Sequence, residues 1–336
     1  MTANILAIGP HVEGVIRIEA NQSADAEGRD VLTFLGSMEV HSRVHDVEGG
    51  ELHNGVPKHQ AHPITEKLMQ LPVNAEAGKL KEIPIRLFFN TASNALKSRY
   101  QAYNMGTGVP ACSGDGRTAV RRDRMELSNE ASRTVDCHGP EVCDYALSGQ
   151  ATCRRQVALT VQIVGQDDPL SVFQLRSSSY HTYKALAGQL AFIEKRFAGL
   201  RHVPLKLKLW TSSSRLSNYR EFDLFKLALD AATEVDAMKA AKAARHDEET
   251  AGLCPAVDDA YAADGDATQN SAADDFDLTE QFYQERDGQS AAPRVQQDGA
   301  IGKTAPAGNN LASNVLTAAL SAARGAAESG APRDKD

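Results

Sequence analysis

The sequence predicts an α+β protein: a strand-rich core with a four-cysteine zinc loop, one main amphipathic helix and a disordered acidic C-terminal tail. Three observations lead to this class. Apolar and polar residues alternate over several short segments between residues 82 and 210. Four of the five cysteines lie within residues 112–153. Residues 246–336 carry 17 Asp or Glu against 6 Lys or Arg, a net charge of −11 against −8 for the whole chain. The first 245 residues are therefore mildly basic.

Strands are expected in the first ninety residues, over 12–19, 30–39 and 82–90. The last of these, EIPIRLFFN, places alternate apolar side chains on one face, as a half-buried strand does. A helix is expected within residues 91–103, because Leu96 and Tyr100 share a helical face. Residues 106–156 are rich in glycine and polar residues and are expected to form loops.

Regular structure is expected again from residue 157. Residues 157–164 and 171–176 alternate as strands do. Ser178 or Ser179 is then expected to cap a helix that runs to about Phe197 and stops at Gly199. Its apolar stripe consists of Tyr183, Leu186, Leu190, Ile193 and Phe197. Residues 203–210 predict another strand, whereas residues 219–230 fit a strand or a helix.

The composition predicts one folded domain over residues 1–235, followed by a tail over 236–336. The tail is acidic, Ala-rich and poor in aliphatic residues, so burial offers little to offset the entropy of ordering it. One tail segment, DDFDLTEQFYQE, is a candidate exception to this disorder, and a DNA-binding accessory protein would use it as a short helix to recruit another protein. Its apolar residues are Phe276, Leu278, Phe282 and Tyr283.

The cysteines predict a structural zinc site. The proposed ligands are Cys112, Cys137, Cys143 and Cys153. Zinc prefers four tetrahedral thiolate or imidazole ligands, and no apolar periodicity explains burial of these thiols. Two alternatives stay open: His138 replaces one thiol, or the cysteines are free and bind no metal. Cys254 lies in the tail and is expected to take no part.

Arginines accompany the cysteines in sequence. They are Arg117, Arg121, Arg122, Arg154 and Arg155. Positive charge beside cysteine favours the thiolate that binds metal. The same arginines are candidates for contacts with DNA phosphates or with an acidic protein surface, and a solvated loop is an equal alternative.

Other features of the sequence limit the possible classes of function. We find no signal peptide and no apolar run of membrane-spanning length, and five cysteines do not suggest a disulfide framework. We therefore expect a soluble protein of the reducing cytoplasm, with no membrane partner. No phosphate-binding loop, GxSxG elbow or HExxH motif is present, so we expect no enzymatic activity.

Several segments together resemble the recombination directionality factor-like family of phages and mobile elements. They are IPIRLFFN, CSGDGRTAVRR, the cysteine cluster and the stretch from FQLRSSS to VPLKLKLW. In the family's Cys-x-Gly-Asp-Gly-x-x-Ala-x-Arg pattern, Cys112, Gly114, Asp115, Gly116 and Ala119 match, with Arg121 or Arg122 at the end. Residues 173–178 and 199–207 match the next two pieces of the pattern.

The resemblance implies a non-catalytic accessory protein of a prophage or integrative element. Such a factor binds a serine integrase, or another protein of the element, and biases site-specific recombination toward excision. The cysteine loop, the helix over 179–197 and the strand after it are expected to form the integrase-facing module. The alternative is a zinc-containing DNA-binding accessory of element replication or maintenance. A metal-dependent hydrolase is a third possibility, for which we find no catalytic groups.

Overall fold

The computed structural model describes residues 10–24, 30–42, 52–53, 56–57, 60–104, 110–122, 132–149, 151–213, 215, 219 and 221–252. The chain divides into two units, residues 1–293 and 294–336, and every described residue belongs to the first. The tail motif (Phe276, Leu278, Phe282 and Tyr283) and Cys254 lie outside the described residues.

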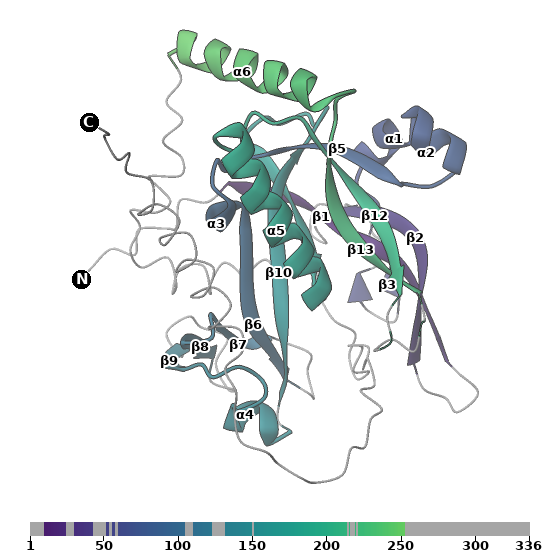
Figure 1. Cartoon of the computed structure of the whole chain (residues 1–336). Coiled ribbons are helices and arrows are strands. Elements are labelled where there is room, and N and C mark those ends of the chain that lie inside the picture. Colours follow the sequence, from purple (N-terminus) through teal and green to yellow (C-terminus); the bar gives the residue numbers. More distant parts are fainter. Residues whose placement is uncertain are drawn as a thin grey trace, which may run out of the picture. The chain divides into compact units, whose positions relative to one another are not determined.

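Strands dominate the described part (Figure 1). They are β1 His11–Ala24, β2 Asp30–Ser42, β3 Leu52–His53, β4 Val56–Pro57, β5 Glu82–Leu87, β6 Leu96–Asn104, β7 Pro110–Gly114, β8 Thr118–Arg122, β9 Ser132–Asp136, β10 Ala151–Ile163, β11 Ser171–Ser177, β12 Leu205–Ser213 and β13 Glu221–Leu229. The helices are α1 Ile64–Met69, α2 Pro72–Ala77, α3 Ala92–Ala95, α4 Asp144–Leu147, α5 Tyr180–Phe197 and α6 Glu234–Thr250. This strand-rich mixed sheet with a few helices confirms the α+β class.

The long strand β10 is the point at which the main sheet divides (Figure 1). One edge of β10 pairs with β6 over residues 151–159 and with β5 over residues 161–163. Its other edge pairs with β11, which in turn pairs with β1. β5 continues into β12 and β13, whereas β6 continues into β7, β8 and β9. The sheet therefore has two wings that share one strand.

The main core lies on the first wing. Alternate side chains of β5 (Ile83, Ile85 and Leu87) are fully buried, and Ile85 and Leu87 are paired with Ile163 and Val161 of β10. Each fully buried side chain of this size contributes about 1.5–3 kcal/mol. The alternation expected over residues 82–90 is thus confirmed, with β5 ending at Leu87.

Helix α5 covers this core (Figure 1). Ser179 caps it by accepting a hydrogen bond from the Thr182 amide at 3.2 Å, as expected. Leu186 and Leu190 of its apolar stripe are fully buried. At the C-terminal end Gly199 has a φ of +134°, and a Cβ there would lie 2.2 Å from Asn90 Oδ1. Only glycine therefore fits where the chain leaves α5.

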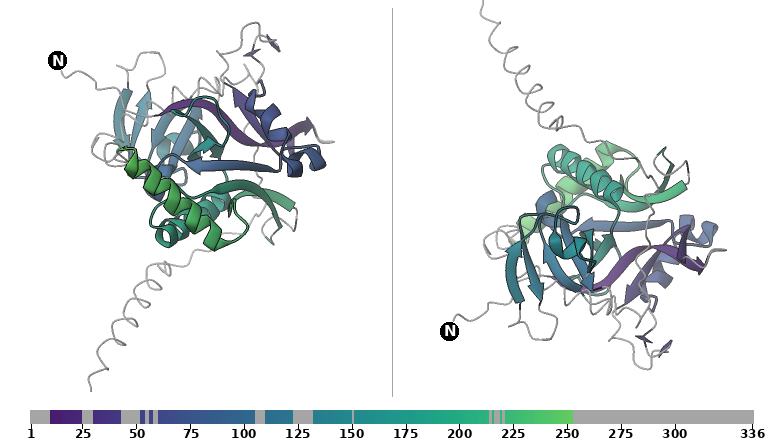
Figure 2. Two further views of the ribbon diagram at one scale, coloured as in Figure 1. Left: turned by 90° about the horizontal axis from the view of Figure 1, so that it is seen from above. Right: turned by 90° about the horizontal axis from the view of Figure 1, so that it is seen from below.

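Helix α6 lies across the C-terminal end of α5, as the view from above shows (Figure 2). Its Ala237 and Ala241 are buried in the main core, and Arg245 donates to the carbonyl oxygen of Phe197 at 3.1 Å. This helix occupies part of the segment that we expected to belong to the tail from residue 236. The folded part thus reaches at least Gly252, because small Ala side chains allow close packing where larger aliphatic residues are missing.

Two expectations about the middle of the chain are wrong. The helix expected over residues 91–103 is a single turn, α3, followed by the strand β6. Pairing with β10 along nine residues outweighs the helical spacing of Leu96 and Tyr100. The loop expected over residues 106–156 contains β7, β8, β9 and the start of β10. These strands carry small and polar residues, so no alternation of large apolar residues marked them.

The ambiguous segment over residues 219–230 is a strand, β13, which pairs with β12 along its whole length. Among the described helices, none is long and apolar enough to cross a membrane.

Candidate metal centre

The candidate metal centre is built on the second wing of the sheet, around the β7–β8 hairpin. Asp115 forms its turn: Oδ1 accepts hydrogen bonds from the amides of Arg117 at 2.7 Å and Thr118 at 2.8 Å. Gly116 supplies the turn's positive φ of +97°. Burial acts to raise the pKa of Asp115, but these amides outweigh it and the net shift is downward. The turn therefore uses the carboxylate as a structural acceptor.

Strand register brings two of the cysteines to one face of the sheet. Cys153 on β10 is paired with Ala102 on β6, Ala102 with Cys112 on β7, and Cys112 with Arg121 on β8. Directly paired residues project from the same face. Ala102 lies between the two cysteines and has a single methyl group, which leaves space for both sulfur atoms.

The other two cysteines, Cys137 and Cys143, lie on the segment that connects β9 to α4. Cys137 comes directly after β9, and its amide donates to the carbonyl oxygen of Arg117 at 2.8 Å. Cys143 precedes the short helix α4. Gly114 allows the close approach of this segment, because a Cβ there would lie 2.8 Å from Cys137 Sγ.

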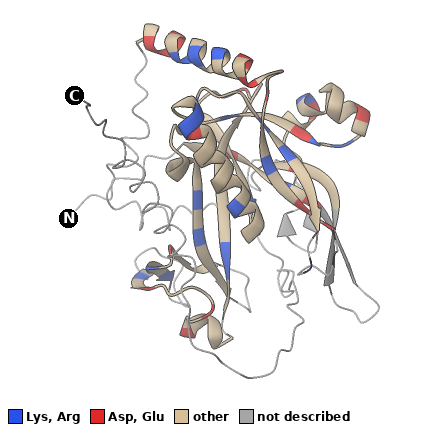
Figure 3. Cartoon of the chain, viewed as in Figure 1, with Lys and Arg blue, Asp and Glu red and all other residues tan. Residues whose placement is uncertain are grey.

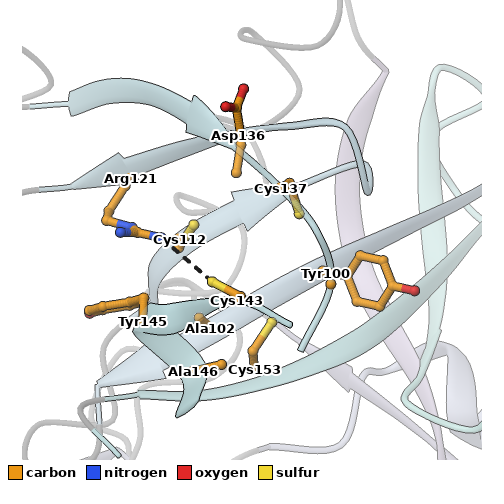
Figure 4. Close-up of a pocket in the computed structure, with 12 residues that line it drawn as sticks. Tyr100, Ala102, Cys112, Arg121, Asp136, Cys137, Cys143, Tyr145, Ala146 and Cys153 are labelled. Carbon is orange, nitrogen blue, oxygen red and sulfur yellow. Dashed lines mark hydrogen bonds between the residues drawn. The ribbon is translucent and has the colours of Figure 1, made fainter. Parts of the chain in front are cut away.

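All four predicted cysteines line one pocket (Figure 4). They come from four separate segments, and none forms a disulfide. Cys112 and Cys137 are buried, whereas Cys143 and Cys153 are half-buried. Burial raises the pKa of Cys153 to about 12, with a further increase from the other three cysteines. Among the described residues, no three His, Cys, Asp or Glu side chains stand together at the spacing of metal ligands.

Arg121 is the cation of this pocket (Figure 4). Its Nη2 lies 3.8 Å from Cys143 Sγ, and its guanidinium lies 4.2 Å from the centre of the Tyr145 ring. Its Nε is buried and has no hydrogen-bond partner in the described structure. Burial raises the pKa of Cys112, and the hydrogen bond from Arg121 opposes that shift. The pocket thus holds a positive charge directed at sulfur.

The other predicted arginines are dispersed. Arg117 is exposed in the β7–β8 turn. Arg122 and Arg154 are neighbours of Arg121 and Cys153 in their strands, so they project from the opposite face of the sheet. His138 is exposed and is not among the residues that line the pocket.

Arg155 lies among tyrosines. Its Nη2 donates to Tyr100 OH at 2.6 Å, and its guanidinium lies 4.9 Å from the Tyr100 ring centre and 5.4 Å from that of Tyr183 on α5. Tyr100 also lines the cysteine pocket. It therefore links the pocket to the N-terminal half of α5, a role that sequence reasoning missed because aromatic residues scattered through strands and a helix have no shared spacing.

Five neighbouring strands around β10 carry basic residues and no acidic ones, whereas β9, at the edge of this wing, carries Arg133 and Asp136. Across β6, β7, β8, β10 and β11 there are seven cations and no Asp or Glu. The cations are Lys97, Arg99, Arg121, Arg122, Arg154, Arg155 and Arg176. Figure 3 shows Lys and Arg bands along β6 and β10. By register, all except Arg121 and Arg155 project from the face opposite the cysteines.

Comparison with known proteins gives a family match over most of the described residues. The family model described as Gp3-like, recombination directionality factor-like, matches residues 19–230. No curated protein and no solved structure matches this chain. The matched range includes the main sheet apart from the first residues of β1, together with the cysteine pocket and α5.

Proposed function

Because this chain belongs to the recombination directionality factor-like family, we propose that it binds a serine integrase and biases site-specific recombination toward excision. In this proposal it acts without chemistry of its own, as an accessory protein of a phage or integrative element. The observation that carries the proposal is the family match, which spans residues 19–230 and with them both wings of the sheet.

The surface beside the cysteine pocket suits a protein partner. Val142, directly before Cys143, and Leu147, the last residue of α4, are 63% and 64% exposed. Tyr180 and Phe192 on α5 are 56% and 67% exposed. Exposed aromatic residues provide large contact areas in protein interfaces. The proposed integrase-facing surface consists of α4 and the outer side of α5, which Arg155 and Tyr100 connect.

The switch requires only differential binding. A factor that binds the excision-competent arrangement of integrase more tightly than the integration-competent one shifts the balance by that difference in free energy. Couplings of this kind are typically about 1–3 kcal/mol, which is about 5- to 150-fold in an equilibrium.

A reconstituted recombination assay tests the proposal. The full chain is added to the integrase encoded by the same element, with substrates that carry either the integrated or the free attachment sites. We expect excision to increase and integration to decrease. Phe192→Glu on the outer side of α5 is expected to abolish both effects, whereas Leu170→Glu, on an exposed loop before β11, leaves them unchanged. Unchanged recombination in both directions with the wild-type chain would reject the proposal.

The acid-free strands support a second candidate function, direct DNA binding in element replication or maintenance. Lys97, Arg99 and Arg154 share one face with the half-buried Gln156, whereas Gln101 and Ser113 on that face are buried. Cations and neutral polar side chains on one surface are the groups that contact phosphates. Under this candidate the chain binds duplex DNA without integrase, and affinity falls steeply as salt rises.

Charge-removing variants separate the two candidates. Combining Arg99→Gln with Arg154→Gln is expected to weaken DNA binding and reduce the salt slope by about 2. Arg196→Gln is the matched control, because Arg196 lies on α5 in a surface ion pair with Glu234 at 2.7 Å. Binding that needs integrase at every salt concentration would count against the second candidate.

A further inference from the structure

The four-cysteine pocket forms the centre of a small cluster that is separate from the main core. Its buried members are Ala102, Cys112, Ala119, Cys137 and Ala151. Alanine and cysteine bury little apolar area compared with Leu or Ile, so this cluster contributes little hydrophobic stabilisation. It nevertheless has to hold β7, β8 and β9, each five residues long, at the edge of the sheet. A wing with so small an apolar core needs an additional cross-link.

The cysteines offer two kinds of cross-link, disulfides or a metal. Two disulfides would use the thiols in pairs and leave the buried guanidinium of Arg121 with neutral sulfur neighbours. Thiolates on a metal ion accept hydrogen bonds and carry negative charge, which suits a buried cation. The Nε of Arg121, buried without a partner in the described structure, and its Nη2, 3.8 Å from Cys143 Sγ, both favour charged sulfur in the pocket.

We propose that this pocket binds one Zn²⁺ through the thiolates of Cys112, Cys137, Cys143 and Cys153, and that Arg121 is a positioning residue that offsets the site's charge. Four thiolates and one Zn²⁺ together carry a net charge of −2, and the positive charge of the guanidinium reduces the net charge of the site to −1. Each thiol releases its proton to solvent on binding. In the described structure the four thiols line one pocket, but they are not spaced as metal ligands are. Zinc binding would therefore bring the sulfur atoms closer together.

Tyr145 gives Arg121 a fixed position. Its ring centre lies 4.2 Å from the guanidinium carbon, which limits the rotation of the side chain. Arg121 is paired with Cys112 in the β7–β8 register and contacts the sulfur of Cys143 beyond it. The cation therefore lies between two of the proposed ligands. Zinc binding at this pocket does not depend on integrase binding, and measurements of metal binding alone test it.

Metal content of the full chain, purified under reducing conditions, tests the site. We expect about one zinc per chain, and a tetrahedral thiolate absorption spectrum when Co²⁺ replaces Zn²⁺. Cys137→Ser and Cys153→Ser are expected to lose the metal, whereas Cys254→Ser, the fifth cysteine, retains it. The cobalt spectrum of the wild-type chain decides the question even if the serine variants fail to fold. Less than about a tenth of an ion per chain after incubation with zinc, or disulfides among the four cysteines, would overturn the proposal.

A chelator competition tests the role of Arg121. Arg121→Gln is expected to weaken zinc binding by about 10- to 100-fold, the usual effect of losing a group that orients metal ligands. Arg121→Lys restores part of the loss because it keeps the charge without the planar fork. Arg117→Gln is the matched control, since Arg117 is exposed in the adjacent turn. If Arg121→Gln and the control bound zinc with equal affinity, Arg121 would have no role in the site, and the four thiolates would remain as the proposed ligands.

Discussion

The side-chain amide of Gln189 on α5 forms hydrogen bonds with both backbone polar groups of Leu227 on β13, as a neighbouring strand would. Gln189 Oε1 accepts from the Leu227 amide at 2.8 Å, and its Nε2 donates to the Leu227 carbonyl oxygen at 3.3 Å. β13 is an edge strand of the sheet. Unpaired edge strands recruit strands from other molecules, so this contact closes part of an edge that would otherwise promote aggregation.

Replacing Gln189 by Ala is therefore expected to lower stability and solubility together. Loss of the two hydrogen bonds costs about 1–2 kcal/mol in the free energy of unfolding. The checks are urea denaturation and light scattering on heating. Lys184→Ala, at an exposed position of the same helix, is the control and leaves both measurements unchanged. Equal aggregation of the two variants would show that Gln189 does not protect β13.

Gly114→Ala is expected to disturb the cysteine pocket. The added Cβ would lie 2.6 Å from the Cβ of Ala119 and 2.8 Å from Cys137 Sγ, and backbone atoms prevent a simple adjustment. We expect a loss of about 1–3 kcal/mol, measured by chemical denaturation. Gly188→Ala on α5 meets no atom within 4 Å and is expected to gain about 0.5–1 kcal/mol instead. A neutral result at Gly114 would contradict the tight packing of the hairpin.

The ion pairs of Glu82 predict a loss of stability in acid. Burial acts to raise the pKa of Glu82, but hydrogen bonds from Lys208 and Lys206 outweigh it and the net shift is downward. A carboxylate with a lowered pKa stabilises the fold above its ordinary value of 4.5, and this contribution is lost as the pH falls through the folded-state pKa. Glu82→Gln is expected to cost on the order of 1 kcal/mol at pH 7 and to show a smaller fall in melting temperature below pH 4.5. Parallel acid curves for the variant and the wild type would reject this assignment.

Removing residues 253–336 is expected to leave the melting temperature within about 2 °C of that of the full chain. The reason is that α6, which ends at Thr250, still packs on the core through Ala237 and Ala241. Ending the chain at residue 235 would remove that helix and lower the melting temperature. Differential scanning calorimetry of the two truncations separates these outcomes. A large loss in the longer chain, which keeps α6, would place part of the tail in the fold.

Sequence reasoning predicted elements well where large apolar residues repeat. The alternation of Ile83, Ile85 and Leu87 and the stripe of α5 both correspond to buried faces. It failed on β6, where the spacing of Leu96 and Tyr100 suits a helix and the strand that pairs with β6 is about fifty residues away. It failed on the hairpin strands because they carry mainly small and polar residues. Long-range pairing decided their structure, and that information is not local.

The candidate site was predicted in part. The clustering of four cysteines in sequence was enough to expect them in one place, and they line one pocket. The separate positions of Arg121 and Arg155 were not foreseen, because adjacent residues can be assigned to opposite faces only once the strand is known. The aromatic neighbours Tyr100 and Tyr145 carried no spacing signal at all.

The strand β10 belongs to both wings, and this makes the hairpin region sensitive to the length of the chain. A single residue inserted between Arg154 and Val157 would reverse the faces of the β10 residues before it while the core end stayed in place. Arg154 would then project toward the pocket, and Cys153 would project away from it. Relatives of this protein that retain the pocket should therefore keep the number of residues between this cysteine and the core invariant, even where the residues themselves differ.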